Sequence, residues 1–122
     1  MNRFTIRKSF SFSASHQLLH LPSEHPCRRM HGHNYNVELE LSGNLLNVND
    51  FIVDYRELDV VKRWLDETFD HQHLNDVPGM ERPTAENIAA FIFNHIKTTF
   101  PQLTAVTVSE TDKTSATYRP GE

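Results

Sequence analysis

Two segments of this chain alternate apolar and polar residues with a period of two, and this pattern limits the fold more than any other feature. In the first segment the even positions carry Phe4, Ile6, Phe10 and Phe12. In the second, the odd positions carry His31, His33, Tyr35, Val37, Leu39 and Leu41. Such alternation is typical of a β-strand with one buried face. We therefore expect two strands, joined by a polar loop over residues 20–29, which contains two prolines.

The period becomes helical in the middle of the chain. Asp54, with Glu57 three residues later, fits a capping box at a helix start. Apolar residues follow at helical spacing: Leu58, Val61, Leu65 and Phe69. Thr84 can cap a second helix, which Pro101 ends. The apolar face of this helix is expected to carry Ile88, Phe91, Ile92 and Ile96.

Two further short strands are expected near the end of the chain, one marked by Val106 and Val108 and the other by Ala116 and Tyr118. The resulting order, ββααββ, predicts an α+β fold in which two helices cover one face of an antiparallel sheet. A chain of 122 residues is the size of one domain, so we expect a single domain over residues 1–122. So small a sheet has exposed edges, and pairing between subunits would cover them, which favours a homo-oligomer.

The bulk composition excludes several classes of protein. The net charge is −4 and there is no basic run, which argues against nucleic acid as a partner. No apolar stretch approaches the roughly 20 residues of a membrane helix, and the first residues lack the apolar core of a secretory signal. The single cysteine, Cys27, cannot form an internal disulfide, so we expect a reducing, cytoplasmic location.

Histidine is the unusual residue of this chain, because five of the eight histidines lie between positions 16 and 33. His31 and His33 point to the apolar face of their strand, and Gly32 between them allows a close approach. Two imidazoles on a buried face are costly unless they are bonded. His16 has the parity of the apolar face of the first strand. If the strands pair, three nitrogen ligands converge, as in a catalytic zinc site with one open position. The alternative is that these are surface or hydrogen-bonded core histidines.

Cys27 is a second candidate for chemistry, because it lies four residues before His31 and is followed by Arg28 and Arg29. Positive groups and a metal nearby would favour the reactive thiolate. Two alternatives remain. The thiol is buried and inert, or it is a fourth zinc ligand, which would make the site closed and structural.

Two acidic residues complete the set of candidates. Asp70 precedes His71 and could orient its ring or stabilise imidazolium, although such a dipeptide is most often a solvated loop. Glu110 has the parity of the third strand's apolar residues, so its carboxylate would face the buried side and need a donor. A ligand that offers two parallel N–H groups would suit it. The alternative is that the strand has already ended and Glu110 is solvated.

Together these residues resemble the 6-pyruvoyl-tetrahydropterin synthase superfamily. The matching elements are His16, Cys27-x-x-x-His31-Gly32-His33, Asp54-Tyr55, Phe69-Asp70-His71, Leu74-Asn75, Pro83-Thr84-x-Glu86-Asn87 and Ser109-Glu110-Thr111. Three residues separate Cys27 from His31. This spacing resembles that of the bacterial, carboxy-forming branch, which contains the 6-carboxytetrahydropterin synthases of queuosine biosynthesis. Animal-type pyruvoyl synthases have a longer insert at this point. Phe69 stands where the family often has leucine, and residues 111–115 match no diagnostic version.

The resemblance implies a tunnelling fold, in which ββααββ subunits join their sheets into barrels as a tetramer or hexamer with active sites at subunit interfaces. It implies one zinc per subunit, held by His16, His31 and His33. The family's cysteine base falls on Cys27, and its Asp-His pair, from a neighbouring subunit, on Asp70 and His71. Its pterin-anchoring glutamate falls on Glu110, and Thr84 and Glu86 lie in the segment that lines the pterin pocket.

The implied reaction converts 7,8-dihydroneopterin triphosphate into 6-carboxy-5,6,7,8-tetrahydropterin, acetaldehyde and triphosphate. In it, zinc stabilises alkoxide or enolate charge, Cys27 takes a proton from the side chain, and His71 relays protons. Two other functions stay open. One is a 6-pyruvoyl-tetrahydropterin synthase, which eliminates triphosphate without cleaving the carbon chain. The other is a non-catalytic binding module stabilised by zinc.

Overall fold

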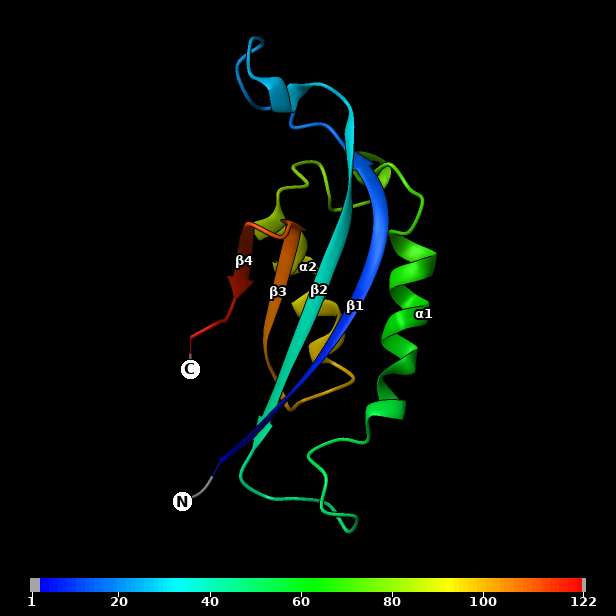
Figure 1. Cartoon of the computed structure of the whole chain (residues 1–122), viewed down its shortest axis with the longest axis vertical. Coiled ribbons are helices and arrows are strands. Elements are labelled where there is room, and N and C mark those ends of the chain that lie inside the picture. Colours follow the sequence, from blue (N-terminus) through cyan, green and yellow to red (C-terminus); the bar gives the residue numbers. More distant parts are fainter. Residues whose placement is uncertain (1–2, 122) are drawn as a thin grey trace.

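The computed structural model describes residues 3–121 and contains one antiparallel sheet and two α-helices (Figure 1). The strands are β1 (Phe4–His16), β2 (His31–Gly43), β3 (Leu103–Thr111) and β4 (Thr114–Tyr118), and they lie in the order β1-β2-β3-β4. The helices are α1 (Asp59–Thr68) and α2 (Ala85–Lys97). Three 3₁₀ turns lie between these elements: η1 (Pro26–Arg28), η2 (Tyr55–Leu58) and η3 (Leu74–Asp76). This arrangement confirms the predicted ββααββ order.

The core lies between the sheet and the helices, because the strand residues of one parity all point to that side. In β1 the even positions from Phe10 to His16 are buried, and in β2 the odd positions from Tyr35 to Leu41 are fully buried. In Figure 1, α2 lies behind the sheet and α1 runs alongside β1. The predicted apolar face of α1 is confirmed, since its four members are buried: Leu58, Val61, Leu65 and Phe69. The predicted apolar face of α2 is confirmed for Ile88, Ile92 and Ile96, which are buried. Phe91 is only half-buried, and Phe93, which was not predicted, is buried.

The start of the first helix differs from the prediction. Asp54 is confirmed as a cap, since its side chain accepts a hydrogen bond from the backbone N–H of Arg56 at 2.9 Å at the start of η2, but the capping box with Glu57 is wrong. Glu57 instead donates its backbone N–H to the carbonyl of Asp54, which closes a 3₁₀ turn. Because this tighter turn comes first, α1 begins only at Asp59.

The outer edge of β1 is covered at one end by residues 70–73. His71 donates its backbone N–H to the carbonyl of Ser13 at 2.6 Å, and Ser15 donates to the carbonyl of Gln72 at 3.1 Å. The remainder of this edge and the outer edge of β4 have no neighbouring strand among residues 3–121. Neither helix in that range has the length and apolar character needed to cross a bilayer.

Candidate metal centre

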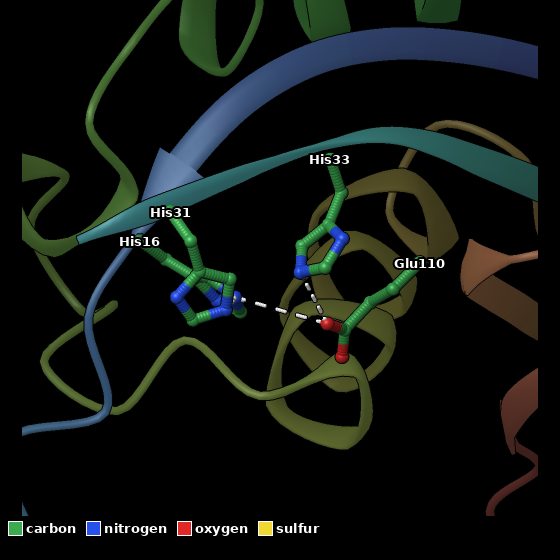
Figure 2. Close-up of side chains that lie close together, drawn as sticks. All are labelled: His16, His31, His33 and Glu110. Carbon is green, nitrogen blue, oxygen red and sulfur yellow. Dashed lines mark hydrogen bonds and ion pairs between the residues drawn. The ribbon is translucent and has the colours of Figure 1, made fainter. Parts of the chain in front are cut away.

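The pairing of β1 with β2 brings three histidines together at one end of the sheet. His16 lies opposite His31 in the register, and His33 lies opposite Ala14. Since these residues share the parity of the buried face, all three imidazoles point toward the helices (Figure 2). The ring of His16 is buried, and the Nε2 atoms of His16 and His31 are 2.9 Å apart. The convergence predicted from the sequence is therefore present.

Glu110 joins the histidines from β3. This strand continues to Thr111, so the alternative that the strand ends before Glu110 is wrong. The Glu110 Oε2 atom lies 2.8 Å from His33 Nε2 and 3.7 Å from His16 Nε2 (Figure 2). The four side chains offer ligand atoms that all lie within 4.8 Å of one another. The structure thus places the carboxylate beside the imidazoles, a proximity that sequence parity did not predict.

Two backbone carbonyls determine the tautomers of these histidines. The Nδ1 atom of His16 lies 2.8 Å from the carbonyl oxygen of Pro83, and that of His31 lies 2.7 Å from the carbonyl oxygen of Arg29. A carbonyl only accepts hydrogen bonds, so each Nδ1 carries the ring proton and donates it. Each neutral ring then has a lone pair at Nε2. When both rings are neutral, these two lone pairs face each other at 2.9 Å, an arrangement that a cation between them would stabilise.

The charge state of His16 agrees with this assignment. Burial lowers the pKa of His16, and this effect exceeds the opposing influence of the Pro83 carbonyl and the Glu110 carboxylate, which both favour the charged form. His16 is therefore neutral near pH 7 and available as a nitrogen ligand. A ligating imidazole that donates its other N–H to a backbone carbonyl is the usual outer-shell arrangement of protein metal sites.

Two buried polar atoms near this cluster have no hydrogen-bond partner in the described part of the chain, His33 Nε2 and the Tyr35 hydroxyl. Although His33 Nε2 lies 2.8 Å from a carboxylate oxygen of Glu110, the two groups are not oriented to form a hydrogen bond. The Tyr35 ring lies 5.4 Å from that of His33. Buried polar atoms without a hydrogen-bond partner are uncommon in proteins, and a bound ion or water is one usual explanation. The cluster offers three imidazole nitrogens and one carboxylate as ligand atoms, and such a set could hold a metal ion such as zinc.

We expect the Tyr35→Phe variant of the metal-free protein to be as stable as the wild type, or more stable by up to about 1–3 kcal/mol. Burial and the nearby Glu110 charge both raise the pKa of Tyr35, so the hydroxyl stays protonated, yet it has no acceptor. Removing an unpaired buried hydroxyl relieves its desolvation penalty. Chemical denaturation measures the difference, with Tyr118→Phe, a half-buried tyrosine on β4, as the control. A loss of more than about 1 kcal/mol would show that the Tyr35 hydroxyl has a partner in solution.

Cys27 lies in η1, in the loop between β1 and β2, and is half-buried. It does not belong to the converging group of His16, His31, His33 and Glu110. The structure therefore gives no support to a closed site of Cys27 with three histidines within one subunit.

Asp70 and His71 lie at the outer edge of β1 rather than in the histidine cluster. Asp70 accepts hydrogen bonds from the backbone N–H of Ser13 at 2.8 Å and from His71 Nδ1 at 2.9 Å. These bonds, the first more than the second, lower the pKa of Asp70 and keep it ionised. The His71 side chain is 83% exposed, and its backbone has a positive φ of 58°. Such a φ is unusual for a residue other than glycine.

An open pocket of about 490 Å³ lies beside His71 at the ends of β1 and β2, and its residues Ser13, Ser15 and Asn34 have the parity of the sheet face opposite the histidine cluster. Its wall includes both His71 and His33, together with residues from the ends of β1 and β2. Of the four residues of the cluster, His33 is the one that belongs to this wall.

Thr84 and Glu86 lie at the start of α2. The Thr84 hydroxyl accepts a hydrogen bond from the backbone N–H of Asn87 at 3.2 Å, which confirms its role as the helix cap. Glu86 is exposed in the first turn. The preceding residue, Pro83, holds the ring of His16, so the beginning of α2 adjoins the metal centre.

Asn75 is a positioning residue whose role the sequence pattern did not reveal. Its Oδ1 accepts the backbone N–H of Gln17, and its Nδ2 donates to the carbonyl of the same residue, both at 2.8 Å. This pair of bonds fixes the chain directly after His16. The Leu74-Asn75 dipeptide was visible in the sequence as part of a resemblance, but nothing local indicated its partner, because Gln17 is 58 residues away.

Comparison with known proteins agrees with this geometry. A 41% identical relative from Synechocystis, a 6-carboxy-5,6,7,8-tetrahydropterin synthase, matches over 93% of this chain and 91% of its own length. A putative enzyme of the same name from Archaeoglobus fulgidus is 34% identical over 91% of both chains. The solved structure of Caenorhabditis elegans 6-pyruvoyl tetrahydropterin synthase superposes with a TM-score of 0.88 at 28% identity, covering 99% of this chain and 98% of the other. The family model for 6-pyruvoyl tetrahydropterin synthase matches residues 5–121. The chain is therefore a member of the 6-pyruvoyl tetrahydropterin synthase family.

Proposed function

We propose that this protein is a zinc-dependent 6-carboxy-5,6,7,8-tetrahydropterin synthase. It takes 7,8-dihydroneopterin triphosphate and one water and yields 6-carboxytetrahydropterin, acetaldehyde and triphosphate. The observation that carries the proposal is the convergence of three imidazoles and a carboxylate, whose ligand atoms all lie within 4.8 Å of one another. The name of the Synechocystis relative and the three-residue spacing between Cys27 and His31 favour the carboxy-forming reaction.

In this proposal His16, His31 and His33 hold the zinc ion. When bound, zinc acts as a Lewis acid toward the side-chain oxygens of the substrate and stabilises negative charge that develops there. The protein prepares the site in advance: the carbonyls of Pro83 and Arg29 orient two of the rings and hold the proton of each neutral ring at Nδ1, which leaves Nε2 as the ligand atom. Three protein ligands leave a position free for substrate, as catalytic zinc sites require.

Cys27 is the proposed base that removes a proton from the substrate side chain, and Asp70 with His71 is the proposed proton relay. The Asp70 carboxylate, held by the backbone of Ser13, orients the imidazole and stabilises its protonated form. Because the His71 ring is exposed at a sheet edge, it is available to a neighbouring subunit. Thr84 and Glu86 are the proposed lining of the pterin pocket, next to Pro83.

Glu110 is the proposed anchor of the pterin ring. Its carboxylate could accept two parallel N–H groups from the amino-pyrimidine edge of the pterin. Its position 2.8 Å from His33 Nε2 would hold the pterin beside the metal centre. The same proximity raises a second possibility, that Glu110 is a fourth metal ligand, and substitution distinguishes the two roles.

We expect Glu110→Gln to weaken pterin binding by about one to two powers of ten while leaving the zinc content unchanged. Glutamine keeps the shape but loses the charge and replaces one acceptor oxygen with a donor amide. A lost hydrogen bond to a charged group costs roughly 1.5–3 kcal/mol. A pterin-binding titration and a metal analysis on the same sample measure both effects. Loss of zinc would make Glu110 a metal ligand, and unchanged pterin affinity would remove it from the pterin site.

The family resemblance and the free strand edges support a homo-oligomer, a tetramer or hexamer of single-domain subunits with active sites at their interfaces. Unpaired edges invite strand pairing between copies. We propose that the protein acts in the cytoplasm, in queuosine biosynthesis. Native mass spectrometry measures the subunit number, and a monomer that is fully active would contradict an interface site.

The main competing function is that of a 6-pyruvoyl-tetrahydropterin synthase, which the close match to the C. elegans structure keeps open. Incubation with 7,8-dihydroneopterin triphosphate, followed by mass analysis of the pterin and an acetaldehyde assay, separates the two. The carboxylated pterin with stoichiometric acetaldehyde supports our proposal. A pyruvoyl product without acetaldehyde supports the competitor, and no turnover by the zinc-loaded protein would favour a non-catalytic zinc module.

A further inference from the structure

We propose that His25 is a positioning residue for Cys27, an inference that rests on the catalytic role proposed for Cys27. His25 lies at the N-cap of η1, with an extended backbone (φ −70°, ψ 130°). Its Nδ1 atom accepts a hydrogen bond from the backbone N–H of Cys27 at 3.1 Å. The single turn that carries the thiol thus begins with a hydrogen bond that the His25 ring accepts.

Histidine is not among the residues that usually cap helices, which are serine, threonine, aspartate and asparagine. The His25 ring performs this role because Nδ1 occupies the same place relative to Cβ as the Oδ1 of asparagine. Accepting at Nδ1 requires the neutral ring with its proton at Nε2. The side chain is otherwise exposed, so the hydrogen bond to Cys27, rather than core packing, is what the imidazole contributes.

The other backbone group of Cys27 is bonded as well. Its carbonyl accepts the N–H of Leu18 at 2.9 Å, and Leu18 follows the proposed ligand His16 by two residues. Gln17, between them, is fixed on both sides by Asn75. The backbone of Cys27 is therefore connected to the end of β1 on one side and to the His25 ring on the other. Without the ring, the turn keeps the Leu18 bond and the backbone bonds from Arg28 to His25 and from Arg29 to Pro26, but the Cys27 N–H loses its acceptor.

A base must lie within hydrogen-bond reach of the proton that it removes. Small displacements of catalytic groups lower rates strongly, since much of catalysis depends on orientation. Loosening η1 should therefore lower turnover without changing the metal ligands or the pterin anchor. The effect should appear in kcat rather than in KM.

The test compares His25→Ala, His25→Asn and the control His20→Ala, which removes an exposed imidazole from the same loop. Because Cys27 is the only cysteine, labelling with ¹⁵N-cysteine gives a single amide resonance that reports on this N–H. We expect faster solvent exchange of that amide in His25→Ala, and wild-type exchange in His25→Asn and His20→Ala. For the zinc-loaded enzymes we expect kcat to fall about three- to tenfold in His25→Ala, with KM and zinc content unchanged, and to recover in His25→Asn.

Unchanged exchange of the Cys27 amide in His25→Ala would overturn the capping contact, and this measurement needs no substrate. Equal losses of kcat in the alanine and asparagine variants would overturn capping as the cause. Wild-type kcat in His25→Ala would overturn the positioning role. If the wild-type enzyme itself does not turn over dihydroneopterin triphosphate, the proposed function fails, whereas the amide exchange still decides whether His25 caps the turn.

Discussion

Replacing His31 with alanine is expected to remove bound zinc and turnover together, with at least about a thousandfold loss of activity, because a metal ion contributes several kcal/mol to such a reaction. His31 lies 2.9 Å from His16 at the converging Nε2 atoms, so the variant deletes one proposed ligand and leaves an incomplete site. Metal analysis and a turnover assay on the same preparation measure both effects, with His20→Ala as the control for loss of an exposed imidazole.

The metal-free proteins give a second and independent comparison. Without a cation, the lone pairs of the neutral His16 and His31 rings repel each other. Relief of this repulsion offsets the loss of the exposed hydrogen bond from His31 to Arg29, so metal-free His31→Ala should be about as stable as the metal-free wild type. Histidines that hydrogen-bond to each other in the core would behave oppositely, since removal of one partner costs about 1–3 kcal/mol. A marked loss of stability in the metal-free variant, together with retained zinc in the loaded one, would contradict the ligand assignment.

The convergence of the histidines was predictable because side-chain direction in a strand follows from sequence parity alone. His16 has the parity of Phe10 and Phe12, and His31 has that of Val37, so the pairing of two consecutive strands necessarily brings the rings to one face. The apolar faces of α1 and α2 were predictable for the same reason, with the helical period in place of the period of two.

Contacts between distant segments were not predictable in this way. The carbonyls of Pro83 and Arg29 orient the rings, but every residue has a carbonyl, so no sequence signal marks these two. The proximity of Glu110 to His33 depends on how β3 pairs with β2 and on the length of the two side chains. The parity of a residue in the sequence predicts only the face of the sheet to which it points. The 3₁₀ turn before α1 was missed because the same residues, Asp54 and Glu57, fit both a capping box and the tighter turn.

The loop that carries Cys27 was the least predictable part of the site. It has no hydrophobic period, and its conformation depends on single hydrogen bonds such as those from Leu18 and Arg28. The Arg28 guanidinium donates to the carbonyls of Leu19 and Leu21, which holds the loop closed. That the charge of Arg28 favours the Cys27 thiolate stays a prediction. The structure gives this arginine a clear structural role.

Replacing Cys27 with alanine is expected to leave fold and zinc content intact while turnover falls by about two to four powers of ten, the usual contribution of general acid–base catalysis. The thiol is outside the converging group of ligand atoms, so its loss should not weaken the metal centre. Its backbone contacts do not involve the sulfur, so His25 and Leu18 still hold the turn. Metal analysis, circular dichroism and a single-turnover assay of product formation measure the three quantities.

The Cys27→Ser variant sharpens this test, because serine keeps a hydroxyl of similar size but is a far weaker acid than a thiol. If Cys27 acts as a base through its thiolate, serine should be nearly as inactive as alanine, and zinc should remain stoichiometric in both. If Cys27 were instead a structural ligand, both variants would lose zinc and stability along with activity, since structural zinc sites contribute directly to folding. Full turnover in Cys27→Ala with retained zinc would exclude both roles and transfer the proton removal to another group at the pocket, of which His71 is the exposed titratable side chain.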